Sequence, residues 1–128
     1  MLAKLRFLII DDSKPVLAVY TELLQHAGHE VTAFSSCDQA LDHIIRHQPD
    51  CVLCDLILPG MDGLELLRNI RKEKLVPEAL VIMLTNESAS TRIEEAKSLQ
   101  VSGYIVKATS LPSEVVEEII KIADAHIK

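Results

Sequence analysis

Aromatic side chains and positive charge are both scarce in this sequence. Tryptophan is absent, and two Tyr and two Phe residues bring the aromatic content to only 3%. Hydrophobic residues nevertheless make up 48% of the chain, which is too many for a disordered protein. We therefore expect a folded protein with an aliphatic core. The formal net charge of −6 disfavours nucleic acid or an anionic membrane surface as a direct partner, because both attract basic faces.

Long apolar runs and a secretory leader are also missing. No apolar run approaches the ~20 residues that span a bilayer. The N-terminal stretch MLAKLRFLIIDD turns acidic too early for a signal peptide, so the sequence predicts a soluble, cytoplasmic protein. The length of 128 residues matches one domain with one hydrophobic core. No linker follows the last predicted helix, and we expect a single domain over residues 1–128 with no output domain.

Cysteine is rare, and its spacing favours neither a disulfide nor a metal site. The chain has three Cys residues, and thiols inside cells stay reduced. Cys51 and Cys54 form a C-x-x-C pair, but they fall in a predicted strand. Residues three apart on a strand point to opposite faces and lie about 10 Å apart, whereas a disulfide needs Cα atoms within roughly 7 Å. We therefore interpret both as core residues rather than a redox or zinc pair.

The order of apolar and amphipathic segments predicts an α/β fold. Five apolar segments lack clean alternation, as expected of strands buried on both faces; they cover residues 5–10, 29–34, 51–58, 79–84 and 104–106. Helical patterns follow them over residues 15–27, 37–47, 63–74, 89–99 and 112–127. This alternation predicts a five-stranded parallel sheet in a (βα)5 arrangement, with right-handed crossovers and helices on both faces.

Two of the predicted helices carry clear end signals. Pro15 near the start and Gly28 just past the end frame the first helix, which is the usual asymmetry of these two residues. Ser36 and Gln39 have the spacing of a capping box before the second helix.

Polar side chains mark the carboxyl ends of four predicted strands. They are Asp11 and Asp12 after the first strand, Asp55 in the third, Thr85 after the fourth and Lys107 after the fifth. In a parallel sheet these ends meet at one edge. Three carboxylates in one pocket repel each other, so either one of them holds a proton or a cation lies among them. Hard oxygen ligands suit Mg²⁺. A nucleophilic Asp, a divalent cation, a Lys and a hydroxyl are the groups that hold a phosphoryl group in transfer.

These residues lie in motifs that resemble the receiver domain of bacterial two-component response regulators, in particular its single-domain, chemotaxis-regulator-like members. The matching stretches are DD at 11–12, DLILPGMDG at 55–63, MLT at 83–85 and GYIVK at 103–107. The resemblance covers nearly the whole chain. It implies a flavodoxin-like fold with strand order 2-1-3-4-5. It also implies a stand-alone signalling switch in a phosphorelay rather than an enzyme, with self-catalysed phosphoryl transfer and autodephosphorylation.

The resemblance assigns the chemistry to particular residues. It implies that Asp55 accepts a phosphoryl group from a phosphohistidine on a sensor histidine kinase or a phosphotransfer protein. It implies that Asp11, Asp12 and Asp55 hold Mg²⁺ together with the backbone carbonyl of Ile57. Lys107 would contact the phosphoryl oxygens.

The resemblance also implies how phosphorylation is reported to a partner. Thr85 would act at the phosphoryl group and, together with Tyr104, would form the switch. A downstream effector protein would then bind the face made by the fourth helix, the fifth strand and the fifth helix. These are the predicted segments 89–99, 104–106 and 112–127.

Two positions differ from the family pattern. Ala108 follows Lys107 where the family usually has Pro, and Asn86 follows Thr85 where the family usually has a small residue. A cis peptide bond before a residue other than Pro costs about 2.5–4 kcal/mol, so we predict a trans Lys107–Ala108 bond.

Three other functions match parts of the pattern. A degenerate receiver would be an interaction module that is never phosphorylated, but every expected site residue is present. An aspartyl-phosphate phosphatase would need a second Asp two residues after its nucleophile, where Ile57 stands. A flavin protein would need a loop that cradles phosphate, whereas the loop DDSKP at 11–15 is acidic.

Two charged or titratable clusters are interpreted as solvated helix faces. His43 and His47 have the i, i+4 spacing that can bind metal on a helix, but no third ligand is evident in the sequence. The second cluster is basic and comprises Arg68, Arg71, Lys72 and Lys74.

Overall fold

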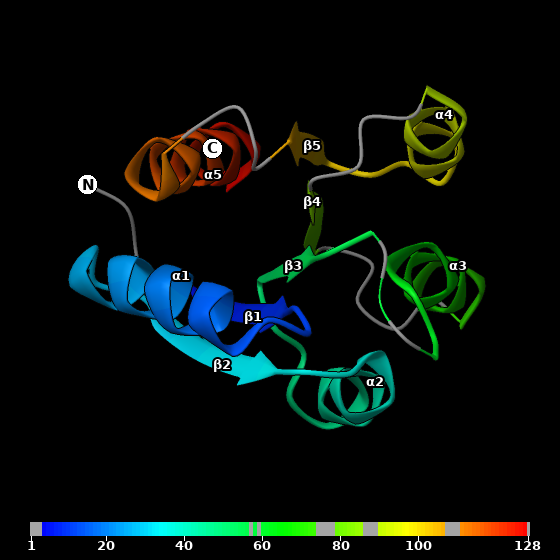
Figure 1. Cartoon of the computed structure of the whole chain (residues 1–128), viewed down its shortest axis with the longest axis horizontal. Coiled ribbons are helices and arrows are strands. Elements are labelled where there is room, and N and C mark those ends of the chain that lie inside the picture. The colour runs from blue at the N-terminus through cyan, green and yellow to red at the C-terminus, as the bar shows by residue number, and fades with distance from the viewer. Residues whose placement is uncertain are drawn as a thin grey trace.

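Strands and helices alternate strictly in the computed structural model (Figure 1). The structure describes residues 4–56, 58, 60–73, 79–85, 90–106 and 111–127, with only the backbone described at residues 85, 90–93, 126 and 127. The strands are β1 (Arg6–Ile10), β2 (Glu30–Phe34), β3 (Cys51–Cys54), β4 (Leu80–Thr85) and β5 (Gly103–Val106). The helices are α1 (Lys14–His26), α2 (Cys37–His47), α3 (Gly63–Glu73), α4 (Ser90–Ser98) and α5 (Pro112–Ile127).

The strands form one parallel sheet in the order β2-β1-β3-β4-β5, which confirms the predicted (βα)5 fold and its strand order. β1 lies between β2 and β3, with Ile10 level with Phe34 on one side and with Cys54 on the other. The carboxyl ends of these central strands therefore lie next to each other. No helix in the described part of the chain is long and apolar enough to cross a membrane.

Helices cover both faces of the sheet, with α1 and α5 on one side and α2, α3 and α4 on the other (Figure 1). Alternate residues of each strand contribute to two separate aliphatic clusters. Leu8 and Val52 belong to the cluster beneath α2, α3 and α4, whereas Phe7 and Leu53 belong to the one beneath α1 and α5. The scarcity of aromatic residues is thus compatible with two well-filled layers.

Cys51 and Cys54 belong to different layers of this core. Cys51 packs in the cluster under α1 and α5, and Cys54 packs in the cluster on the other face. Both are buried free thiols. The interpretation of the C-x-x-C pair as two core residues is confirmed.

The helix-end signals in the sequence act as predicted. Pro15 lies in the first turn of α1, and Gly28 follows the end of that helix with a φ of 96°, a left-handed conformation that glycine adopts readily. Ser36 is the N-cap of α2, and its hydroxyl accepts a hydrogen bond from the backbone N–H of Gln39.

The structure corrects two details of the sequence-based prediction. The apolar run of residues 51–58 is not a strand throughout: β3 ends at Cys54, one residue before the predicted end at Asp55, and Leu56 and Leu58 are buried in the loop that follows. Burial in this loop explains why the apolar run is longer than the strand. The other correction concerns Arg71, which does not lie on a solvated face: its Nε and Nη2 donate to Leu99 O and Gln100 O at the end of α4. The Lys107–Ala108 bond lies outside the described residues.

Candidate functional site

Backbone hydrogen bonds bring the ends of three strands together. The N–H of Asp55 donates to Ile10 O at 3.0 Å, and the N–H of Asp11 donates to Phe34 O at 3.2 Å. The sheet hydrogen bonds thus continue for one residue beyond β1 and β3. Asp11 and Asp55 are positioned by the strands themselves rather than by flexible loops.

Three carboxylates converge at this edge of the sheet. Asp11, Asp12 and Asp55 each offer a carboxylate oxygen, and these oxygens lie within 4.8 Å of one another. Asp11 is buried with 4% of its surface exposed, Asp55 is partly buried, and Asp12 is exposed. Among the described residues this is the one group of three or more carboxylate, thiol or imidazole ligands that meets this distance. The predicted convergence of the three aspartates is confirmed.

Asp11 is held in place by the start of α1. One of its carboxylate oxygens, Oδ1, accepts a hydrogen bond from the backbone N–H of Ser13 at 2.9 Å. Ser13 in turn caps α1, because its hydroxyl accepts from the N–H of Val16. This support was not predicted from the sequence, although an Asp two residues before a helix-capping Ser is a common turn signal.

The segment after Asp55 is closed tightly onto the end of β3. The N–H of Gly63, the first residue of α3, donates to Leu56 O at 3.1 Å. A Cβ at Gly63 would overlap the carbonyl oxygen of Asp55 and approach the Cα of Leu56 to 3.0 Å. Asp62 Oδ1 accepts from the N–H of Glu65 at 3.0 Å and caps the helix. Gly63 is therefore required because α3 begins in direct contact with the Asp55 backbone.

Cys54 lies directly below the carboxylates but is not available as a nucleophile. Its thiol donates to the carbonyl oxygen of Asp55 at 3.2 Å. A hydrogen bond with Cys37, burial and the nearby carboxylates of Asp55 and Asp11 raise the pKa of this thiol. Since thiolates, not thiols, are the nucleophiles, Asp55 has no competitor in Cys54.

The remaining predicted site residues are only partly within the described structure. Thr85 is the last residue of β4, where its backbone is paired with Val106 of β5; its side chain lies outside the described part. Ile57 and Lys107 also lie outside it. Tyr104 is on β5, level with Met83 of β4, and its partly buried ring packs against the aliphatic cluster under α2, α3 and α4.

The donor set fits a hard divalent cation. Three carboxylate oxygens within 4.8 Å bring strong mutual repulsion that a cation relieves. Mg²⁺ prefers oxygen ligands and keeps several of its waters, which the exposed position of Asp12 permits. Soft or borderline ions prefer thiolate and imidazole, and the neighbouring Cys54 thiol stays protonated. Of the ions that bind proteins, Mg²⁺ therefore matches this chemistry well.

Comparison with known proteins identifies relatives of the whole fold. Residues 7–120 match the family model of the response regulator receiver domain. The phosphate regulon transcriptional regulatory protein PhoB of Pseudomonas aeruginosa is 32% identical over 109 residues, which cover 85% of this chain and 47% of that protein.

Solved structures are similar over nearly the full length. A CheY-like receiver domain protein of Methanospirillum hungatei is 27% identical, with a TM-score of 0.87 and coverage of 97% of both chains. A LuxR-family two-component response regulator of Aurantimonas sp. is 30% identical, with a TM-score of 0.84 and coverage of 96% of this chain and 87% of that one. The Vibrio cholerae chemotaxis protein CheY4 is 25% identical, with a TM-score of 0.85 and coverage of 94% and 99%.

The chain spans about half the length of the curated relative that it matches. The expectation that no output domain accompanies the receiver stays a prediction.

Proposed function

The chain belongs to the response regulator receiver domain family. On that premise we propose that Asp55 is its phosphoryl acceptor. The phosphoryl group would come from a phosphohistidine of a sensor histidine kinase or a phosphotransfer protein. Receiver domains are phosphorylation switches that typically bind Mg²⁺ at an acidic pocket. The observation that carries the proposal is the convergence of the Asp11, Asp12 and Asp55 carboxylates at the carboxyl edge of the sheet.

The positions of the three carboxylates suggest different roles in phosphoryl transfer. Asp55 follows β3, is partly buried, and begins the loop that Gly63 closes, so its carboxylate can face an incoming phosphorus. Asp11 and Asp12 follow β1 and would hold the cation together with Asp55 and the carbonyl of Ile57. Bound Mg²⁺ would supply positive charge against the phosphoryl oxygens.

Transfer then requires one displacement at phosphorus. An Asp55 carboxylate oxygen attacks, the new P–O bond forms as the P–N bond to the donor imidazole breaks, and the imidazole leaves with that electron pair. We propose that Lys107 neutralises charge on the phosphoryl oxygens and that the Thr85 hydroxyl donates to one of them, because Thr85 is the last residue of β4 and Lys107 follows β5 in the sequence. Positioning and charge stabilisation are the main requirements of phosphoryl transfer.

Phosphorylation of Asp55 is tested by labelling with a small phosphodonor. We expect acetyl phosphate to label the parent protein in Mg²⁺, and we expect no label with EDTA or in Asp55→Asn. Asp38→Asn is the matched control, because Asp38 is an exposed aspartate on α2 that does not belong to the carboxylate cluster. Label retained in Asp55→Asn would disprove the assignment. A parent protein that never takes label would favour an interaction module that works without phosphorylation.

We also propose that the phosphorylated form signals through the face made by α4, β5 and α5. β5 is an edge strand of the sheet and lies between these two helices in Figure 1. Its ladder with β4 pairs Thr85 with Val106 and Met83 with Tyr104, so movement at Thr85 reaches Tyr104 through neighbouring residues. A phosphoryl group shifts the population only if it binds one arrangement better than the other.

The proposed face is tested by NMR with beryllofluoride, which imitates the phosphoryl group. We expect chemical shift changes around Asp55 and across α4, β5 and α5 in the parent protein, and none in Asp55→Asn. Changes confined to the surroundings of Asp55 would contradict a switch on this face while leaving phosphorylation itself intact.

A further inference from the structure

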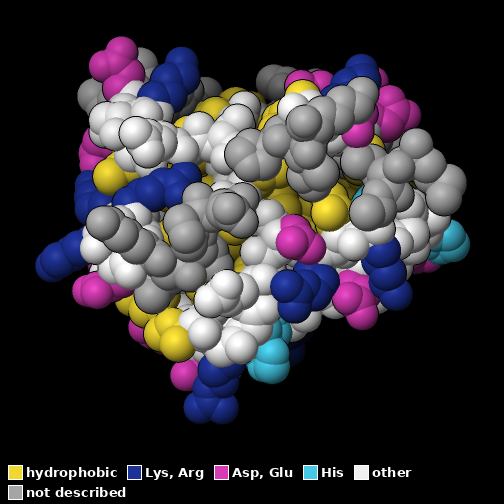
Figure 2. Space-filling model, turned by 180° about the vertical axis from the view of Figure 1, so that it is seen from behind, with side chains coloured by type: hydrophobic (Ala, Val, Ile, Leu, Met, Phe, Trp, Pro, Cys, Tyr) yellow, Lys and Arg dark blue, Asp and Glu magenta, His cyan; other side chains and the backbone are white. Residues whose placement is uncertain are grey.

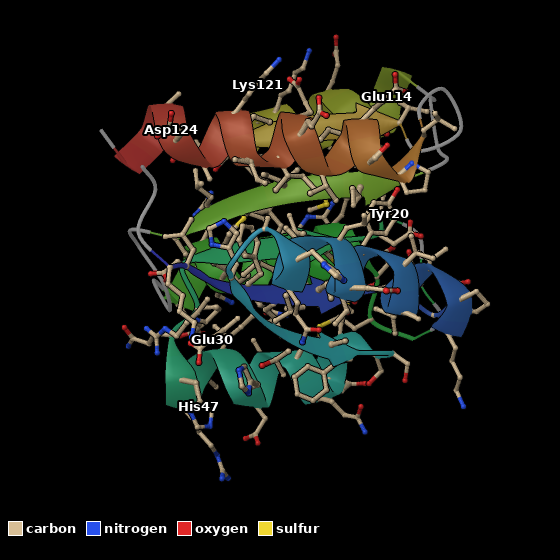
Figure 3. The ribbon with its side chains drawn as sticks, turned by 90° about the vertical axis from the view of Figure 1, so that its left-hand side faces the viewer. Tyr20, Glu30, His47, Glu114, Lys121 and Asp124 are labelled. Carbon is tan, nitrogen blue, oxygen red and sulfur yellow. The ribbon has the colours of Figure 1, made fainter. Side chains whose placement is uncertain are left out.

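A second cleft opens at the end of the sheet opposite Asp55. Its volume is about 430 Å³, and its lining comes from the starts of β1 and β2 and the last turns of α2. Figure 2 looks onto this end of the molecule, where His, Lys, Arg, Asp and Glu side chains gather. In Figure 3, Glu30 and His47, which both line the cleft, are labelled at the end where the strand arrows begin. The cleft is therefore remote from the carboxylate cluster.

Two imidazoles of α2 face this cleft as a pair. His43 and His47 are one helical turn apart and both line the cleft. Their ring centroids are 4.5 Å apart, with 31° between the ring planes. His43 also packs against Phe34 of β2 at a centroid distance of 5.4 Å, which limits the orientations that its ring can adopt. The pair is thus already assembled, and one of its members is held by the sheet.

The cationic side chains of the cleft are engaged by other groups. Arg6 donates from Nη1 to His47 O at 3.1 Å and from Nη2 to Gln48 O at 2.9 Å, and its Nε lies 3.9 Å from Asp50 Oδ2. Lys4 lies 4.0 Å from Glu30. These interactions direct both cationic groups toward acceptors other than the two imidazoles.

His29 also lines the cleft but has a structural role. It is buried, and its Nδ1 accepts a hydrogen bond from the backbone N–H of Leu5 at 3.1 Å. That bond occupies one ring nitrogen and requires the neutral imidazole, whose proton is then on the other nitrogen. His29 therefore has no lone pair left for a metal, and the ligating groups are the two imidazoles of α2.

We propose that His43 and His47 form a binding site for a borderline divalent transition ion such as Ni²⁺, Zn²⁺ or Cu²⁺. Imidazole nitrogens suit these ions, whereas the oxygen ligands around Asp55 suit Mg²⁺. A metal–nitrogen distance of about 2.0–2.1 Å is reached by small rotations of two rings that are already adjacent. Water would complete the coordination, since His43 and His47 belong to no group of three or more His, Cys, Asp or Glu ligands among the described residues.

An ion at this position would fasten the last turn of α2. That turn is already tied to β1 through Arg6, and a metal that links residues i and i+4 adds a second clamp. Because the clamp exists only in the folded chain, binding of the ion must raise thermal stability, and the gain must grow with the logarithm of the ion concentration above the dissociation constant.

The site is tested by titrating the full chain with Ni²⁺ in excess Mg²⁺, which occupies the carboxylate cluster. We expect one equivalent of Ni²⁺ to bind by calorimetry and to raise the melting temperature. His47→Gln and His43→Gln should each weaken binding at least tenfold and abolish the thermal shift. His26→Gln is the matched control, because His26 is an exposed imidazole on α1, and we expect it to leave both readouts unchanged.

His47→Gln is the decisive variant, since His47 is exposed and its replacement leaves the core intact. Circular dichroism confirms that each variant is folded before titration. Unchanged Ni²⁺ binding in folded His47→Gln, or an equal loss in His26→Gln, would overturn the proposed site.

Discussion

Among the described side chains, His29 is the one imidazole that is buried. Its ring meets Phe7 edge to face at a centroid distance of 5.2 Å, and its Nδ1 accepts from Leu5. Burial lowers the pKa of His29 below the ordinary value of 6.5. No role of His29 was predicted from the sequence, because its position just before β2 gives no sign that its ring contacts the residue before β1.

The lowered pKa of His29 predicts acid sensitivity. The unfolded chain takes up a proton at His29 near pH 6.5, and the folded chain does so only at lower pH. Stability must therefore be fully present above pH 6.5 and fall as the pH drops below it. In His29→Asn the amide oxygen can accept from Leu5 without titrating, so we expect a flatter decline of the urea midpoint between pH 7 and pH 5. His26→Gln should keep the parent slope, and a parent slope in His29→Asn would exclude His29 as the source.

Adding a single methyl group at Gly63 should disturb the carboxylate cluster through the backbone of Asp55. In Gly63→Ala the new Cβ would overlap Asp55 O, so we expect a loss of about 1–3 kcal/mol of stability and weaker Mg²⁺ binding as the Asp55 backbone shifts. Gly28→Ala is the control: its φ of 96° also strains the new side chain, but no atom lies within 4 Å and it follows α1 far from Asp55. We expect it to lose stability while keeping the parent Mg²⁺ affinity, measured by calorimetry. Equal Mg²⁺ affinity in Gly63→Ala would contradict the contact.

At the scale of the elements, two arginines fasten the C-terminal ends of helices on the same face of the sheet. Arg6 of β1 donates to the carbonyls of His47 and Gln48 after α2, and Arg71 of α3 donates to those of Leu99 and Gln100 after α4. The last carbonyls of a helix lack partners within it, and a guanidinium offers several donors in one plane. Each arginine thus joins a helix end to a neighbouring element.

The hydrogen bonds of Arg71 should make a measurable contribution to the attachment of α4 to α3. Partial burial lowers its pKa, and it makes hydrogen bonds of 2.9 and 2.7 Å to two carbonyls. We expect Arg71→Ala to cost roughly 1.5–3 kcal/mol of unfolding free energy, the range for hydrogen bonds made by charged groups. Arg68→Ala is the control, because it removes an exposed ion pair with Glu95 and should cost at most about 1 kcal/mol. Urea unfolding of both variants decides the matter; a larger loss in Arg68→Ala would contradict this ranking.

At the scale of the whole molecule, the carboxylate cluster predicts a dependence of stability on Mg²⁺. Binding to the folded state alone adds about 1.4 kcal/mol at ten times the dissociation constant. In Asp12→Asn one of three mutually repelling charges is lost, so we expect this variant to melt higher than the parent without Mg²⁺ and to gain less from its addition. Melting curves over a series of Mg²⁺ concentrations measure both effects. An identical Mg²⁺ response in Asp12→Asn would show that the ion binds elsewhere.

Much of this fold could be predicted from local patterns. Pro15, Gly28 and Ser36 marked helix ends correctly because capping and backbone preferences act within a few residues. The apolar run alone did not give the end of β3, since Leu56 is apolar for burial in a loop rather than for pairing, but Asp55 marked that end to within one residue. The convergence of Asp11 and Asp55 followed from the parallel sheet, which gathers the carboxyl ends of strands.

The contacts that the sequence did not reveal join residues far apart in the chain. In the sequence Arg71 is a basic residue of the third helix, like its exposed neighbour Lys72. Only the fold places the Arg71 side chain near the end of α4. Gly63 matched a family motif, but its contact with the Asp55 carbonyl requires the closed loop. The contacts of Arg71 and Gly63 depend on packing between distant segments of the chain, which local propensities do not predict.

The position of β1 between β2 and β3 in the sheet has a consequence for how the chain folds. All four ladders are parallel, so no two neighbouring strands are joined by a hairpin. The paired residues are therefore far apart in the sequence: Ile82 of β4 pairs with Gly103 of β5, and Phe7 of β1 pairs with Cys51 of β3. Each such pairing closes a long loop before it gains any contact, which slows folding relative to helical bundles. During synthesis β1 therefore lacks one of its two partners until β3 has emerged, and its unpaired edge can until then pair with another chain and start aggregation.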